Sequence, residues 1–134
     1  MLSPKNRKFK YSHVNNFKGI KEIKLSNQGY WGLIAETRGI ITAVQLEAAR
    51  QAISKRIKKI GKTWIRIFPY TPFSKKASET RMGSGKGSIE YWGAIIIPGC
   101  ILFELSDVHY KNAKNALRAA AFKLPIKTKI IQKL

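Results

Sequence analysis

The chain has 134 residues, of which 44% are hydrophobic, and it carries 26 lysines and arginines against 7 acids, for a formal net charge of +19. This apolar content is enough to bury a core, which excludes a disordered basic tail. So large a positive charge opposes compaction unless an anionic partner neutralises it, so nucleic acid is the leading partner class and a membrane surface is the second.

The thiol, imidazole and carboxyl groups do not suggest an enzyme or a metal site. Cys100 is the single cysteine, which excludes an intramolecular disulfide and a cysteine-based zinc site, and we expect it to be a small buried hydrophobe. His13 and His109 are far apart and show neither ligand spacing nor a catalytic arrangement with a serine or an acid. We therefore expect no metal, no cofactor and no catalytic residue.

Residues 1–28 are predicted to form an extended basic arm. The segment has little apolar periodicity, and it could be a mobile terminus or an arm that orders on RNA, of which we favour the second. Its cations include Lys5, Arg7, Lys8, Lys10 and Lys18. Its start is basic but lacks the apolar core of a secretory signal, and no apolar run approaches the ~18 residues of a membrane span, so we expect no membrane insertion.

An amphipathic helix is predicted to begin at Thr42, after a strand over residues 30–35. Thr42 and Gln45 have the spacing of a capping box, and Gly61 stands where a C-terminal glycine belongs. The expected apolar stripe consists of Leu46, Ala49, Ile53, Ile57 and Ile60. The cations on or just beyond the other faces include Arg50, Lys55, Lys58, Lys59 and Lys62. No acid follows Glu47 in this helix, so ion pairs at i,i+4 cannot account for these cations, and we expect them to contact phosphate rather than only water.

Residues 62–68 alternate as a strand does and place Arg66 on the same side as Trp64 and Phe68. Arg66 is therefore expected to be either a cation stacked on aromatic rings or a buried hydrogen-bond donor. Pro69 and Pro72 are expected to end this strand, and residues 70–78 to form a loop.

Residues 81–87 hold three glycines and two cations without an acid. They are Arg81, Met82, Gly83, Ser84, Gly85, Lys86 and Gly87. Glycines let backbone N–H groups approach a ligand closely, and successive N–H groups in such turns form concavities that bind anions. A nucleotide-binding P-loop is excluded, since Lys86 is followed by Gly87 and a strand rather than by Ser or Thr and a helix. The expected ligand is the phosphate of a polymer.

The C-terminal part is predicted to contain two strands, a second helix and a last strand. Residues 89–97 and 100–105 are expected to pair as a hairpin through the turn at 98–99. Ser106 or Asp107 is expected to cap a helix that runs to about Lys123. Its small-residue stripe is Ala113, Ala116, Leu117, Ala120 and Leu124, and its basic edge is Lys111, Lys114 and Arg118. A strand over residues 126–131, with Lys127 on its polar side, completes the chain.

This order of elements predicts an α+β fold with a single two-layer domain over residues 29–134. Two helices would pack on a mixed sheet, and the extended basic arm of residues 1–28 would precede them. We find no linker and no internal repeat. A membrane-surface protein is the less favoured alternative, because the first helix lacks the Trp or Phe usual for interfacial insertion.

Six segments, in this order and spacing, resemble one family. They are MLSPKNRKFK at 1–10, QLEAAR at 45–50, WIRIFP at 64–69, RMGSGKG at 81–87, EYW at 90–92 and KLPIKT at 123–128. Together they are similar to large-subunit ribosomal protein L-sixteen, in its bacterial and organellar form. The resemblance implies an α/β-hammerhead fold, binding to large-subunit rRNA beside the aminoacyl-tRNA site, contact with tRNA and neighbouring ribosomal proteins, and no enzymatic activity.

The resemblance also implies roles for individual residues. The loop of residues 81–87 would approach tRNA, with Arg81 and Lys86 at the boundary between tRNA and rRNA. The residues that the resemblance would place on rRNA are mainly Lys5, Arg7, Lys8, Arg50 and Arg66. On charge we add Lys10, Lys18, Lys55, Lys58, Lys59, Lys62, Arg118 and Lys127 to the expected rRNA-binding residues. The alternative function is a free-standing RNA-binding protein or a ribosome assembly factor.

The chain departs from the family pattern in places, which puts some contacts of the arm in doubt. Residues 12–17 replace a basic cluster, Tyr70 replaces an acid, and Ser84 replaces a common lysine. With the bias toward lysine and isoleucine, these departures predict an organellar ribosome, with mitochondrion favoured over plastid. A bacterial cytoplasm is the alternative.

Overall fold

The computed structural model describes residues 3–5, 19, 29–57, 60–74 and 89–133, and these residues form an α+β fold, as expected. Its elements in chain order are β1 (Trp31–Ala35), β2 (Gly39–Thr42), α1 (Ala43–Ile57), β3 (Lys62–Ile65), β4 (Thr71–Ser74), β5 (Ile89–Ile96), β6 (Ile101–Ser106), α2 (Tyr110–Ala121) and β7 (Thr128–Gln132). No helix in these ranges is long and apolar enough to span a membrane. The division into an arm of residues 1–28 and a domain of residues 29–134 stays a prediction.

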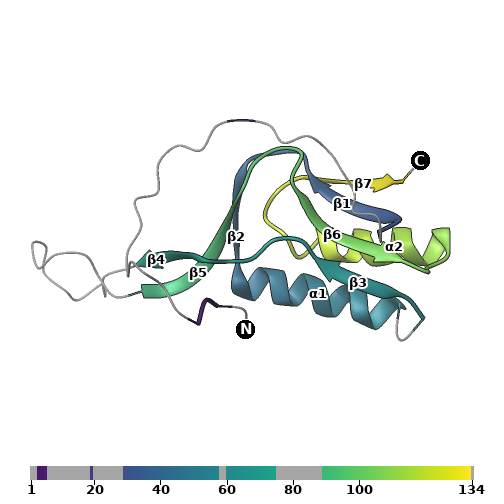
Figure 1. The fold of residues 1–134 in the computed structure, drawn as a ribbon, viewed down its shortest axis with the longest axis horizontal. Helices are drawn as coiled ribbons and strands as arrows, with labels where there is room; N and C mark the ends of the chain where they lie inside the picture. Colours follow the sequence, from purple (N-terminus) through teal and green to yellow (C-terminus); the bar gives the residue numbers. More distant parts are fainter. Residues whose placement is uncertain (1–2, 6–18, 20–28, 58–59, 75–88, 134) are drawn as a thin grey trace, which may run out of the picture.

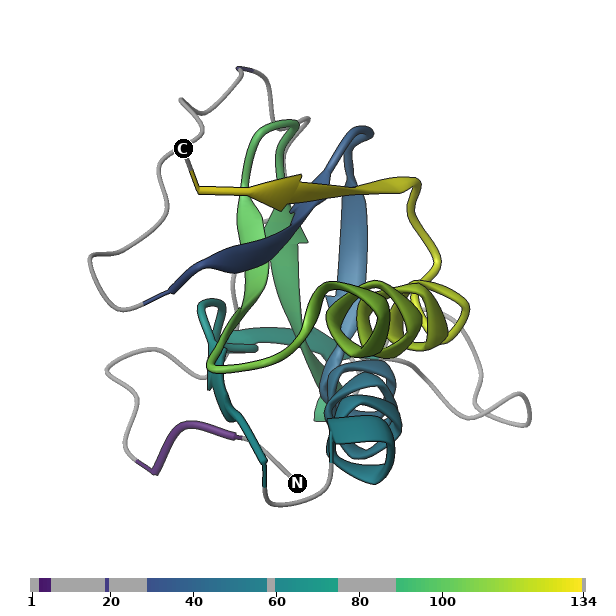
Figure 2. The same cartoon turned by 90° about the vertical axis from the view of Figure 1, so that its right-hand side faces the viewer.

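The strands form two antiparallel sheets, which differs from the one mixed sheet that we expected. One sheet has the order β3-β6-β1-β7 and the other has the order β2-β5-β4. All of the strand pairs in both sheets are antiparallel. The three-stranded sheet extends away from the four-stranded one, and both helices lie side by side in a layer against the sheets (Figures 1 and 2).

The hydrophobic core lies between the helix layer and the sheets. Its large side chains with almost no exposed surface include Leu33, Ile41, Leu46, Ile53, Ile96, Leu102, Phe103, Leu105 and Leu117. The small-residue stripe of α2 is buried throughout, as predicted, and its alanines allow α2 to pack closely. Cys100 is also buried, as expected. The helices are therefore held by their apolar faces, which leaves their polar faces free for a ligand.

The predicted hairpin between residues 89–97 and 100–105 is wrong, because β5 and β6 belong to different sheets. The turn itself is present, and Gly99 has a φ of 88°, which favours glycine. However, Gly99 N–H donates to the Ala35 carbonyl at 2.9 Å, and Ala35 N–H donates to the Cys100 carbonyl at 2.9 Å. The chain after the turn thus pairs with the end of β1 and passes from one sheet to the other.

Two short strands were not expected. β2 occupies the four residues directly before α1, and β4 lies in the segment that we predicted to be a loop. Pro72 lies within β4, which is possible because β4 is an edge strand and needs no N–H from Pro72 on its open side. The strand predicted over residues 62–68 ends at Ile65, although Arg66 N–H still donates to the Leu102 carbonyl at 3.0 Å.

The start of α1 is confirmed, while its end differs from the prediction. Thr42 N–H donates to Gln45 Oε1 at 3.0 Å, and Gln45 N–H donates to Thr42 Oγ1 at 3.2 Å, which is a capping box. Ile60 is 68% exposed and does not belong to the buried stripe. Gly61 does not have a positive φ, so it is not the predicted left-handed cap. A Cβ atom there would collide with Val108 Cγ2, so close packing explains this glycine.

The predicted cap of α2 is also wrong. Ser106 is the buried last residue of β6, and Asp107 adopts a φ of 59°. His109 is the N-cap instead, and its Nδ1 accepts a hydrogen bond from Lys111 N–H at 3.4 Å. The cap lies later than expected because the chain must first turn away from the end of β6, and it does so at Asp107 and Val108 before the helix begins.

Candidate nucleic-acid interface

A groove of about 750 Å³ lies between α1 and α2, which are side by side in Figure 2. Its basic residues are Lys55, Arg56, Arg118 and Lys123, and its amides are Gln51, Asn112 and Asn115. Ala48, Ala52 and Ala119 supply small side chains, and Phe122 lies at the end of α2. We call this surface the helix groove. None of the residues that line it is acidic.

Helical periodicity explains why these side chains share one groove. In α1, Leu46, Ala49 and Ile53 are turned into the core. Ala48 and Lys55 lie on the adjacent row, which therefore faces the neighbouring helix rather than the sheets. The small side chains let the two helices approach, while the long basic side chains extend to the rim and keep their charges in water.

The four cations of the helix groove form no ion pair with the described part of the chain. Lys55 and Arg56 lie in the last turn of α1, and Arg118 lies in the last turn of α2, where cations also stabilise the helix dipole. The dipole accounts for a cation at each helix end. It does not require that the cations of both helices converge on one acid-free groove, which is an arrangement suited to an anion.

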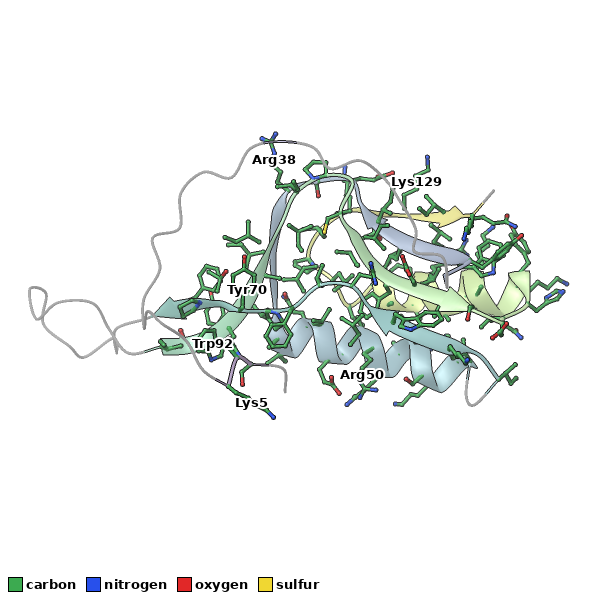
Figure 3. All side chains as sticks on the ribbon, viewed as in Figure 1. Lys5, Arg38, Arg50, Tyr70, Trp92 and Lys129 are labelled. Carbon is green, nitrogen blue, oxygen red and sulfur yellow. The ribbon has the colours of Figure 1, made fainter. Side chains whose placement is uncertain are left out.

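Arg50 lies on a different face of α1 and is paired within the helix. Arg50 Nε donates to Glu47 Oε2 at 3.0 Å, and Arg50 Nη2 donates to Glu47 Oε1. The hydrogen bonds from Arg50 hold the pKa of the Glu47 carboxyl below its usual value, and the same contact raises the pKa of Arg50. The sequence argument considered only pairs at i,i+4, so it did not anticipate that Arg50 pairs with Glu47 at i,i+3. Figure 3 shows Arg50 pointing away from the sheets.

Arg66 forms an ion pair with a buried acid from another strand, unlike Arg50, whose partner lies in the same helix. Its Nε lies 3.8 Å from Oε1 of Glu104, and the Glu104 side chain is fully buried, whereas the Arg66 side chain is 46% exposed. Arg66 is therefore not the buried hydrogen-bond donor that we expected as one of its two roles, because its own side chain is half exposed and the 3.8 Å contact is an ion pair longer than a hydrogen bond. About half of the side chain still faces water and could meet a phosphate.

The other predicted rRNA-binding residues do not gather with the helix groove. Lys5, Lys62 and Lys127 are exposed, but none of them lines it. Lys127 follows α2, and its backbone N–H donates to Thr37 Oγ1 at 3.2 Å. Of the described predicted residues, Lys55 and Arg118 are the two that the fold brings together. Arg7, Lys8, Lys10, Lys18, Lys58, Lys59 and all of residues 81–87 lie outside the described residues.

Sequence reasoning missed most of the polar and aromatic residues of the helix groove. Arg56, Lys123 and Phe122 were not selected, and neither were the amides of Gln51, Asn112 and Asn115. The helical spacing of polar residues in the two predicted helices was the available signal. It could have shown which residues share a row, although not that the two rows face each other.

Comparisons with known proteins agree over the whole chain. A family model described as ribosomal protein L16p/L10e matches residues 4–131. The chain is 47% identical to the large ribosomal subunit protein uL16 of Buchnera aphidicola subsp. Baizongia pistaciae over 134 residues, which cover 100% of this chain and 98% of the relative. It is 50% identical to the uL16 protein of Gluconobacter oxydans, with 100% and 98% covered. It is 47% identical to that of Lysinibacillus sphaericus, with 99% and 93% covered.

Proposed function

The chain belongs to the ribosomal protein L16p/L10e family, and from this premise we propose that it binds large-subunit rRNA and helps to position tRNA at the aminoacyl site. Membership of the family makes the protein a structural constituent of the large ribosomal subunit and not an enzyme. The binding of rRNA and tRNA goes further than membership and is argued from the residues.

The observation that carries rRNA binding is the helix groove. Three cations from two helices, and Lys123 just beyond the end of α2, converge there without an acid and without an ion pair in the described part of the chain. Cations that neutralise phosphates release condensed counterions, and this release drives binding to nucleic acid. The net charge of +19 gives the same preference to the molecule as a whole.

The role at tRNA belongs to residues 81–87, which lie outside the described residues. The strands before and after them support this assignment. Phe73 of β4 and Tyr91 of β5 are paired, and their rings stack with centroids 5.1 Å apart. The segment between the strands therefore starts and ends on one paired ribbon, which extends away from the helices (Figure 1). One protein could then hold rRNA with its helices and present Arg81 and Lys86 to tRNA elsewhere.

Large subunits that carry one variant of this chain at a time test whether the helix groove holds rRNA while the loop of residues 81–87 acts on tRNA. We expect Arg81→Ala to weaken tRNA binding at the aminoacyl site while the chain stays in the subunit at high salt on a sucrose gradient. Lys55→Ala combined with Arg118→Ala should release the chain from the subunit at high salt and affect tRNA binding less. Equal effects of both variants on retention, with no effect on tRNA binding, would contradict the proposal.

The same gradient separates the two functional alternatives. A structural protein stays with the large subunit at high salt, whereas a free-standing RNA-binding protein or an assembly factor is found in the light fractions. Family membership supports the first outcome.

We also propose that the ribosome in question is bacterial. The relatives from Buchnera, Gluconobacter and Lysinibacillus are bacterial proteins, so they do not support the organellar location that the lysine and isoleucine bias suggested. A bacterium with an AT-rich genome would produce the same bias. Fractionation of the source cells, followed by detection of the chain in ribosomes of the cytoplasm or of an organelle, decides between the two.

A further inference from the structure

Phe122 is an aromatic residue in an unusual place. It is 82% exposed, more than any other large hydrophobic residue in the described ranges. It forms the C-cap of α2, where its N–H donates to the Arg118 carbonyl at 3.2 Å, so the helix end holds its backbone in place. Phe122 is one of the residues that line the helix groove, together with the cations. The fold therefore presents an aromatic side chain, on a fixed backbone, to water beside positive charge.

The amides of the helix groove are also available for a ligand. Asn112 and Asn115 are exposed, and in the described part of the chain their side chains have no hydrogen-bond partner. Each amide offers two donor hydrogens and an acceptor oxygen, which suits the mixed donor and acceptor edge of a nucleobase. A phosphate, which only accepts hydrogen bonds, would leave the acceptors unused.

We propose that the helix groove takes a short stretch of unpaired RNA, with one base stacked on Phe122, the edge of a neighbouring base against Asn112 and Asn115, and the phosphates held by the groove cations. This inference rests on the proposed rRNA binding and deepens it. A duplex offers its phosphates but keeps its bases stacked inside, so it would use the cations and leave the aromatic ring without a partner. Aromatic rings combined with a basic groove are typical of sites for unpaired bases.

A protein segment fits this groove less well. An amphipathic helix that docks in a groove needs several apolar anchors at i, i+3, i+4 and i+7. Beside Phe122, the apolar side chains that line the helix groove are Ala48, Ala52 and Ala119, which offer little area to such anchors. The four cations could also bind an acidic peptide, so the test includes poly-glutamate as a competitor.

The experiment measures the affinity of the full chain for two labelled probes by fluorescence anisotropy. One probe is a short oligoadenylate, and the other is a blunt RNA duplex of equal charge. The variants are Phe122→Ala, Phe122→Trp and the control Phe68→Ala, since Phe68 is 43% exposed and lies outside the helix groove. Circular dichroism checks that each variant keeps its fold.

We expect Phe122→Ala to weaken binding of oligoadenylate by about 5- to 150-fold, the range that stacking on one aromatic ring supplies, and binding of the duplex by no more than about twofold. Phe122→Trp should bind oligoadenylate at least as well as the wild type, and Phe68→Ala should change neither affinity. If Phe122→Ala leaves oligoadenylate binding unchanged, or weakens both probes equally, the inference is wrong while rRNA binding still stands.

Two further outcomes distinguish this inference from its premise. If neither probe binds the wild-type chain in a salt-dependent way, the proposed RNA binding itself fails. If poly-glutamate displaces oligoadenylate at equal charge, and Phe122→Ala weakens poly-glutamate by the same factor, the groove selects for acidic chains rather than for a nucleotide, and the inference is overturned.

Discussion

Arg66 and Glu104 join two strands of the four-stranded sheet through a partly buried ion pair, with Arg66 Nε 3.8 Å from Glu104 Oε1. Glu104 lies in β6, where it is fully buried, and Arg66 directly follows β3. A buried carboxylate is costly unless charged or polar groups compensate for lost water. The chain has only 7 acids, and in the described residues Glu104 is the one that the fold buries completely. It therefore fixes Arg66 at the sheet edge.

Replacement of Arg66 should thus affect folding as well as RNA binding. We expect Arg66→Ala to lower the free energy of unfolding by about 1–3 kcal/mol, below the loss typical of a fully buried pair because Arg66 is half exposed. Urea denaturation of Arg66→Ala and of the exposed control Lys62→Ala measures the difference. Combining Arg66→Ala with Glu104→Gln should recover part of the loss. Equal midpoints for the wild type and Arg66→Ala would show that the contact contributes nothing.

The capping box at Thr42 should stabilise the start of α1 measurably. Thr42→Ala removes the oxygen that accepts the Gln45 N–H, so we expect a loss of about 0.5–2 kcal/mol in the free energy of unfolding. Thr42→Ser keeps the acceptor and should lose much less. The check is urea denaturation at neutral pH. A loss of equal size in the serine variant would point to the methyl group of Thr42 rather than to the cap.

The pair of Glu47 and Arg50 predicts a dependence of stability on pH. The hydrogen bond from Arg50 lowers the pKa of Glu47 in the folded state, so its contribution is present above the usual carboxyl pKa and is lost as the pH falls through the lowered value. Glu47→Gln should therefore destabilise the protein at neutral pH, by about 0.3–0.5 kcal/mol for a pair this exposed, and should have a smaller effect as the pH falls toward 3.

Glu36→Gln is the control for the pair, since it removes an exposed acid that has no ion pair in the described part of the chain. The measurement is the urea midpoint of unfolding for the wild type and both variants, at neutral pH and near pH 3. A difference between the Glu47 variant and the wild type that does not shrink as the pH falls would mean that packing, and not charge, is lost.

Local signals in the sequence predicted the helices and β5 well. Thr42 and Gln45 are three residues apart, and the apolar stripe of α1 repeats within the helix, so both signals act at short range. The pairing of β6 with β1 depends on residues far apart in the sequence, because Ala35 at the end of β1 forms hydrogen bonds with Gly99 and Cys100 in the turn before β6. Nothing in residues 98–100 alone shows that the strands separate after that turn, and the hairpin prediction failed for this reason.

The site was predicted residue by residue but not as a surface. Lys55 and Arg118 were both expected to bind rRNA on account of charge alone. That they share one groove depends on how α1 packs against α2. Arg50 was expected to be equivalent to Lys55, yet the pairing with Glu47 and a different face of the helix set it apart. Phe122 could not be distinguished from a core residue before its exposure was known.

The salt dependence of RNA binding should identify which cations bind phosphate. If about eight phosphates of single-stranded RNA are engaged, the slope of log affinity against log salt is about −6 for the wild type. Lys55→Ala with Arg118→Ala removes two cations of the helix groove and should make the slope shallower by about 1.4. Lys111→Ala with Lys129→Ala removes the same charge outside the groove.

We expect this second pair to change the slope much less. Neither lysine lines the helix groove, since Lys129 lies on β7 and Lys111 is exposed in the first turn of α2. Anisotropy titrations of labelled oligoadenylate over a series of salt concentrations give the slopes. Net charge is the same in the two double variants, so unequal slopes can only come from where the cations lie. Equal slopes would mean that the overall field of the protein holds RNA, and the helix groove would lose its special role.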